Sequence, residues 1–166
     1  MIPSSRPTER VVDDLVLRPL TLSDATVTAE VIRTAFGAQS KATRPPSSAL
    51  RETEETVAAK IGPGGGALAS GELVAAALWT IAKDALHVGR VSALPAHRGR
   101  GHARALIAAC EQTARAHGVA RMTLRTRLEL PENERFFERL GFRRIGVETH
   151  EGFDAPTTAV MEKRLS

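Results

Sequence analysis

The sequence has one cysteine, Cys110, no tyrosine and one tryptophan among its 166 residues. One cysteine cannot form an intrachain disulfide or a cysteine-based metal cluster. The apolar helix pattern around Cys110 indicates core packing and not a reactive thiol. We therefore expect a protein without disulfides or a metal site that works in a reducing, cytoplasmic setting.

Long apolar runs are absent as well. No stretch approaches the roughly 20 apolar residues that cross a bilayer, and the first ten residues lack the apolar segment of a signal peptide. The sequence therefore predicts no membrane span and no secretory signal.

Aromatic residues make up 4% of the chain, while the formal net charge is +4 and most of the 23 basic residues are arginine. A basic chain can bind nucleic acid, but such proteins usually carry aromatic side chains on which bases stack. The composition therefore argues against nucleic-acid binding, and we assign part of the basic excess to a polyanionic ligand and part to solvated surface.

The length favours one domain, because a chain of this size buries about 70% of its unfolded surface. Residues 1–10 are rich in proline and serine without periodicity, so we expect a flexible tail followed by one domain over 11–166.

Apolar periodicity predicts alternating strands and helices. The strands are expected at 15–20, 67–70, 73–81, 86–94, 120–130, 142–150 and 157–165. The helices are expected at 23–36, with Ser23 as the cap, and at 49–61, with Ser48 as the cap, then from Gly99 or Arg100 to His117 and at 132–140. The glycine-rich stretch 62–66 is expected to be a linker. This order predicts an α/β fold.

The same pattern predicts which residues of the first two helices are buried. Leu22, Val27, Val31, Ile32 and Ala35 are assigned to the first, and Leu50, Val57 and Ile61 to the second. The glutamates at 52, 54 and 55 are interpreted as a solvated charged face, and an alternative is that residues 44–52 form a lid over a substrate.

Residues 86–104, LHVGRVSALPAHRGRGHAR, combine a strand, a proline break, a basic glycine loop and the start of a long helix. A loop of this kind can present backbone N–H groups to an anion, and the helix N-terminus adds partial positive charge. The loop completes neither the P-loop nor the dinucleotide fingerprint. It predicts a phosphate site of another kind.

The loop resembles the Arg/Gln-x-x-Gly-x-Gly/Ala signature of the Gcn5-related N-acetyltransferases (GNAT), which stands here as Arg98, Gly101 and Ala103. The later segment PENERFFERLGF (131–142) resembles the family's asparagine and aromatic-rich helix that ends in Leu-Gly-Phe. The resemblance covers residues 65–165 well and the first 60 residues loosely. It implies a mixed, mostly antiparallel, twisted sheet of six or seven strands with about four flanking helices.

The resemblance also implies acetyl-CoA as cosubstrate. The pyrophosphate is expected on the backbone and arginines of Arg98, Gly99, Arg100, Gly101, His102 and Ala103. The pantetheine arm is expected beside Val91, Ser92 and Ala93, with Asn133 and Phe137 opposite.

His87, Arg90 and Ser92 interrupt the apolar strand 86–94, which suggests that a cleft crosses it. An alternative for Arg90 and Ser92 is that they are hydrogen-bonded core residues. Because the family often carries a base several residues before the pantetheine segment, the resemblance favours His87 as the general base. Glu129 and Glu52 stay open as alternatives.

Phe137 departs from the family pattern, because relatives often place there a tyrosine that protonates the departing CoA thiolate. The acid is therefore unassigned. Arg125 and Arg127 alternate on the strand 120–130, and if their face lines the acceptor site they favour an acceptor with a carboxylate or phosphate. A solvated strand face is the alternative.

The expected reaction is direct transfer of an acetyl group from acetyl-CoA to a primary amine of a small molecule or peptide. The rival interpretation, favoured by the missing tyrosine, is a regulatory module that binds acetyl-CoA without turnover. The acceptor's identity is open, and a monomer and a homodimer are both retained.

Overall fold

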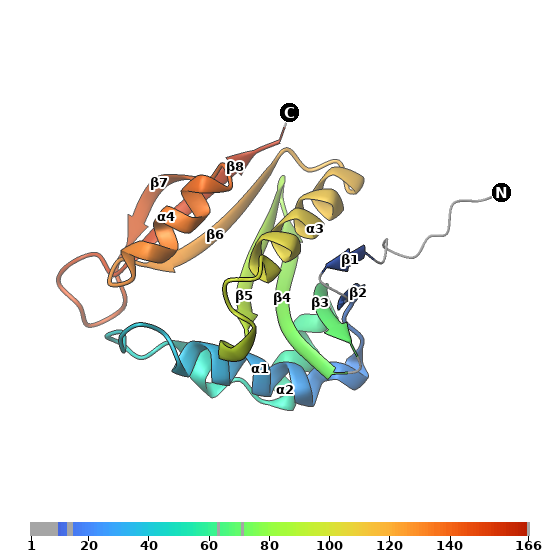
Figure 1. Cartoon of the computed structure of the whole chain (residues 1–166). Helices are drawn as coiled ribbons and strands as arrows, with labels where there is room; N and C mark the ends of the chain where they lie inside the picture. The colour runs from blue at the N-terminus through green and yellow to red at the C-terminus, as the bar shows by residue number, and fades with distance from the viewer. Residues whose placement is uncertain (1–9, 13–14, 63, 71, 166) are drawn as a thin grey trace.

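The computed structural model describes residues 10–12, 15–62, 64–70 and 72–165 (Figure 1). Within them, one sheet contains eight strands: β1 (Arg10–Val12), β2 (Leu15–Pro19), β3 (Gly65–Ser70), β4 (Glu72–Ala82), β5 (Ala85–Ala93), β6 (Arg121–Arg127), β7 (Arg143–Glu148) and β8 (Thr158–Arg164). The α-helices are α1 (Ala25–Gly37), α2 (Glu54–Ile61), α3 (His102–Ala116) and α4 (Pro131–Arg139).

The strand order is β1-β2-β3-β4-β5-β6-β8-β7. The pair β5–β6 is parallel, and the other neighbouring pairs are antiparallel. This confirms the predicted mixed, mostly antiparallel sheet with four flanking helices. The seven strands β2 to β8 match the expected number, and the three-residue β1 is an addition to them.

Two apolar cores lie on opposite faces of the sheet. On one face α3 contributes Leu106, Ile107, Cys110 and Ala114, which pack with Leu86, Met122 and Met161 of the strands. On the other face α1 and α2 contribute residues such as Ile32 and Val57, which pack with Ala76 and Leu78. Successive residues of β4 alternate between these cores, as the two-residue period of a strand requires.

The helix boundaries differ from prediction where local capping decides them. Helix α1 begins at Ala25, after a 3₁₀ turn, η1 (Leu22–Asp24). The predicted helix 49–61 is divided into a 3₁₀ turn, η2 (Ser48–Arg51), and α2. The cap of α2 is Thr53, whose hydroxyl accepts a hydrogen bond from the Thr56 backbone N–H. The predicted cap at Ser48 was therefore wrong.

Helix α3 begins at His102, later than predicted, because Gly99 and Gly101 have left-handed φ angles of 76° and 82°. Such angles are incompatible with a right-handed helix. They make residues 98–101 a loop that leads into the helix.

Several burial predictions were wrong. Leu22, Val27 and Leu50 are 65%, 44% and 40% exposed, because the 3₁₀ turns η1 and η2 and the shifted start of α1 rotate these positions away from the core. Conversely, Glu52, interpreted as part of a solvated face, is 3% exposed. The 3₁₀ turn points it toward basic partners.

Two predicted boundaries shift slightly. Gly65 and Gly66, assigned to a linker, begin β3, and Arg10, assigned to the tail, is the first residue of β1. The rest of the predicted tail, residues 1–9, lies outside the described residues. Among the described residues, the helices are too short or too polar to cross a bilayer.

Candidate active site

A cleft opens where β5 and β6 separate. The two strands pair only at Ala85 with Arg121, Leu86 with Met122 and His87 with Thr123, and both continue beyond that point without pairing to each other (Figure 1). The cleft between them has a volume of about 1020 Å³. Its walls are residues 87–93 of β5, residues 123–127 of β6, the connection from α1 to η2, and α4.

The β5 wall contains a bulge. Ala76 pairs with Ser92 and Leu78 with Gly89, so Arg90 and Val91 together oppose a single residue of β4. Arg90 has a φ of 54°, an angle that is unusual for a residue with a side chain. Its guanidinium donates to Glu52 Oε2 at 2.8 Å and to Ser48 Oγ at 2.8 Å. These contacts fasten the bulge to the segment before α2.

His87 lies where the strands begin to separate. Its Nδ1 is hydrogen-bonded to Thr123 Oγ1 across the β5–β6 pair. Burial, and then the positive charges of Arg125 and Arg121, hold the pKa of His87 below its ordinary 6.5. The imidazole is therefore neutral at pH 7 and can accept a proton. Sequence reasoning had not paired it with Thr123, because the contact joins residues 36 positions apart on two strands.

The two alternative bases are differently placed. Glu52 is absent from the cleft lining and accepts hydrogen bonds from Lys60, Thr56 and Arg90. Burial raises its pKa, but these hydrogen bonds outweigh burial and lower the pKa overall. Glu129 also lies outside the lining and accepts the Arg44 backbone N–H at 3.0 Å.

The glycine loop lies at the edge of the cleft. Arg98 and Ala103 line it, whereas Gly99, Arg100, Gly101 and His102 do not. The Arg98 guanidinium donates to the Ala35 carbonyl at 2.7 Å and the Ala38 carbonyl at 2.9 Å, so this side chain holds the C-terminal end of α1. His102 is buried, and its ring centroid lies 5.9 Å from that of His97.

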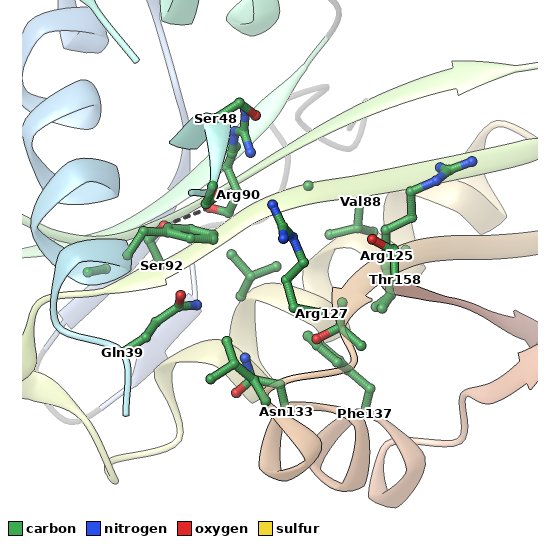
Figure 2. Close-up of a pocket in the computed structure, with 18 of the residues that line it drawn as sticks. Gln39, Ser48, Val88, Arg90, Ser92, Arg125, Arg127, Asn133, Phe137 and Thr158 are labelled. Carbon is green, nitrogen blue, oxygen red and sulfur yellow. Dashed lines mark hydrogen bonds between the residues drawn. The ribbon is translucent and has the colours of Figure 1, made fainter. Parts of the chain in front are cut away.

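The segment expected beside pantetheine lines the cleft at Val91, Ser92 and Ala93. The Ser92 hydroxyl donates to the Arg90 carbonyl at 2.9 Å. Helix α4 provides Asn133 and Phe137 on the facing wall (Figure 2).

Phe137 packs edge-on against Phe136 and Phe142, with ring centroids 5.2 and 6.0 Å away. Its ring therefore belongs to the core under α4 as well as to the cleft.

Arg125 and Arg127 both line the cleft but differ in their partners (Figure 2). Arg125 forms a bidentate pair with Glu148 of β7, at 2.6 and 3.1 Å. Among the described residues, Arg127 has Glu129 as its single ion-pair partner, at 3.9 Å, and its Nη1 atom is buried without a hydrogen bond. The Arg125–Glu148 pair had not been expected, because it joins residues 23 positions apart.

The connection from α1 to η2 closes over one end of the cleft. Ser40 donates to a carboxylate oxygen of Glu132, and Arg44 donates its backbone N–H to Glu129. The segment 44–52, for which a lid was the alternative interpretation, borders the cleft at Pro45, Pro46, Ser47, Ser48 and Arg51. Pro45 and Pro46 keep this part of the segment from forming a helix.

Solved structures with the same fold are N-acetyltransferases. The ribosomal-protein-S18-alanine N-acetyltransferase of Escherichia coli has 18% identity and a TM-score of 0.74, over 92% of this chain and 94% of that chain. The PaiA N-acetyltransferase of Thermoplasma acidophilum, in complex with coenzyme A, has 18% identity and a TM-score of 0.75, over 91% and 99%. YncA of Salmonella typhimurium, with its cofactor acetyl-CoA, has 16% identity and a TM-score of 0.70, over 92% and 94%.

At these identities the structural matches establish the fold alone. No curated protein matches the chain at a significant level. The model of the acetyltransferase (GNAT) family matches residues 31–142, which is most of the chain and includes the diverging strands, the glycine loop and α4. The chain therefore belongs to the GNAT family of acetyltransferases.

Proposed function

We propose that this acetyltransferase moves an acetyl group from acetyl-CoA to a primary amine by direct attack of the amine on the thioester. The observation that carries the proposal is the cleft between β5 and β6, which has the glycine loop at one edge and a neutral histidine on its wall. Membership of the GNAT family supports the same donor.

The glycine loop fits a pyrophosphate. An added Cβ at Gly99 or Gly101 would meet no atom within 4 Å, so the side of the loop where a side chain would stand is open to a ligand. The first backbone N–H groups of α3 follow directly, and a helix N-terminus favours an anion. We assign the pyrophosphate to the backbone of Arg98, Gly99, Arg100, Gly101, His102 and Ala103.

The side chain of Arg98 has a second role in this assignment. Because it is bonded to α1 carbonyls, its contribution to the phosphate is through the loop it anchors. Arg100 is exposed and carries the positive charge nearest to the glycines in sequence.

The pantetheine arm would lie along Val91, Ser92 and Ala93 and face Asn133 and Phe137. Bound acetyl-CoA supplies an activated acyl carbon. His87 takes the proton from the acceptor ammonium, directly or through a water molecule, which leaves a nucleophilic amine. The arginines on the same face disfavour an ammonium and so assist this deprotonation.

Phe137 cannot protonate the departing thiolate, and the chain contains no tyrosine. A thiol has a pKa of about 8.5, so CoA can leave as the thiolate and take its proton from water. The missing tyrosine therefore alters the protonation of the product without preventing transfer. A cytoplasmic location and the choice between monomer and homodimer stay predictions.

Titration calorimetry with acetyl-CoA, followed by an assay of thiol release with pooled amines, amino acids and peptides, tests the proposal. Binding with amine-dependent thiol release is the expected result. Binding without release from any pool would favour the regulatory module. No binding would overturn the assignment of residues 98–103.

A further inference from the structure

We propose that Arg127 binds a carboxylate on the acceptor, so that the substrate class is primary amines that also carry a carboxylate. This inference rests on the proposed acetyl transfer and adds a specificity site to it.

The first observation is the incomplete pairing of Arg127. Its side chain is only 14% exposed, yet its Nη1 is buried and makes no hydrogen bond to the described residues. Burial lowers its pKa, and the charge of Glu129 compensates only in part. A buried guanidinium N–H without an acceptor is costly, so a ligand that supplies an acceptor is favoured there.

The second observation is that the nearest carboxylate is held elsewhere. Glu129 lies 3.9 Å from Arg127 Nη1, beyond hydrogen-bonding distance, and both of its oxygens accept the Arg44 backbone N–H at 3.0 and 3.2 Å. Glu129 therefore fixes the loop after α1 and supplies no hydrogen bond to Arg127 Nη1.

The guanidinium groups of two neighbouring arginines have hydrogen-bond acceptors within the protein. Arg125 is paired with Glu148 through two hydrogen bonds, and Arg90 bonds Glu52 and Ser48. Figure 2 shows Arg127 extending from β6 into the cleft toward β5. Arg127 lines the cleft and is the arginine of these three with a buried guanidinium nitrogen that has no acceptor among the described residues.

The position of Arg127 suits an acceptor and not the donor. It alternates with Leu124 and Thr126 on β6 and so shares a face with Thr123, the partner of His87. Thr123 and Arg127 are four residues apart, or about 13 Å along the strand, and both line the cleft. The space matches a molecule of amino-acid size or somewhat larger.

A single carboxylate is the group that fits. Glu129 lies 3.9 Å away and offsets the charge of Arg127 only in part, so a carboxylate adds one negative charge beside this carboxylate, whereas a phosphate dianion would add two and repel Glu129 more strongly. A guanidinium edge and a carboxylate also match in geometry.

The test compares amino acids with the amines that lack their carboxylate: β-alanine with ethylamine, 4-aminobutyrate with propylamine, and lysine with cadaverine. We expect wild-type kcat/KM to be higher for each acid. Arg127→Gln should lower kcat/KM for the acids by on the order of 10- to 100-fold more than it lowers kcat/KM for the matched amines. Arg127→Lys should retain part of the preference, and it serves as the second variant if the glutamine form is unstable.

Arg125→Gln is the matched control, because Arg125 lies on the same face of β6 as Arg127 but is already paired with Glu148. Assayed at pH 8, it should keep the acid-to-amine ratio of kcat/KM. An equal loss of preference in both arginine variants, or a wild type that does not distinguish acids from amines, would overturn the inference while leaving the transferase intact. A weaker acetyl-CoA affinity in Arg127→Gln would also overturn it, since Arg127 would then serve the donor.

If no amine is acetylated, the proposed function fails and binding decides the inference. Calorimetry of the same acids with the CoA-loaded protein should then detect binding to wild type and not to Arg127→Gln. Equal binding, or none to wild type, would reject the carboxylate site.

Discussion

Glu52 Oε2 accepts a hydrogen bond from Arg90 Nε at 2.8 Å and thereby joins the segment before α2 to the bulge of β5. Lys60 reaches the same carboxylate at 2.5 Å. The left-handed backbone conformation of Arg90 costs about 1–2 kcal/mol, and the buried Glu52 carboxylate with its two cations holds Arg90 in it. The shape of the cleft wall thus depends on a residue outside the cleft.

Replacing Glu52 tests that dependence. Glu52→Gln should reduce the free energy of unfolding by about 2–3 kcal/mol, because it removes the negative partner of two cations. Urea unfolding followed by the fluorescence of Trp79, the single tryptophan, measures the change. Glu55→Gln, an exposed residue of α2, is the control and should stay within about 0.5 kcal/mol of wild type. Equal destabilisation by both would contradict the role of Glu52.

The pH dependence tests His87. Burial and Arg125 lower the pKa of His87, so the imidazole stays neutral at pH values below the ordinary pKa of histidine. We therefore expect kcat/KM to fall only at more acidic pH. His87→Ala should reduce turnover by about 10²- to 10⁴-fold and remove the acidic limb of the profile. Arg125→Gln removes a positive charge and leaves Glu148 unpaired, so it should move the limb to higher pH. A limb that survives in His87→Ala would assign the base to another group.

Two glycines that flank α3, Gly101 and Gly118, provide a matched test of the phosphate loop. Gly101→Asp should weaken acetyl-CoA binding by about 100-fold or more, because a carboxylate would face the pyrophosphate. Gly118 lies at the other end of the helix with a φ of 69° and similarly open surroundings. Gly118→Asp therefore carries the same backbone strain and should bind as wild type does. Calorimetry compares them, and equal losses would point to strain instead of repulsion.

Acid stability should depend on Asp24. Its bidentate hydrogen bonds from Arg18, at 2.8 and 2.9 Å, lower its pKa from 3.8 to about 2. Since the folded pKa lies below the unfolded one, the stabilisation is complete above about pH 4 and is lost as pH falls toward 2. Asp24→Asn should cost about 1–2 kcal/mol at pH 7 and less at pH 3.

Urea unfolding at both pH values measures this difference. Asp154→Asn, at an exposed position, is the control and should change stability little at either pH. If Asp24→Asn lost the same free energy of unfolding at pH 7 and at pH 3, the loss would not come from the charge of Asp24.

The parts of the fold that could be predicted depend on neighbours in sequence. The strand, glycine loop and helix at 86–104 follow from alternation, from two glycines that allow left-handed φ, and from apolar residues at helical spacing. The resemblance to the family motifs added the expectation of a mixed, mostly antiparallel sheet. Helix starts were less accurate, because Thr53 and Ser48 are both good caps and only the local turn decides between them.

The features that could not be predicted depend on distant partners. Glu52 was interpreted as solvated because its cation Arg90 lies 38 residues away. The roles of Arg125 and Arg127 could not be separated, since Glu148 on β7 pairs with one of two equivalent-looking residues. Arg98 was assigned to phosphate by its motif, although its guanidinium reaches the carbonyls of Ala35 and Ala38 at the C-terminal end of α1. Each of these depends on tertiary placement.

Burial of Cys110 in the core beneath α3 raises the pKa of its thiol to about 12. At neutral pH this thiol is neither ionised nor accessible, so reagents that detect free thiols in the folded protein would report released CoA without a background from the enzyme. A cysteine introduced at an exposed position, such as Phe153, could likewise be labelled selectively without first removing the native one.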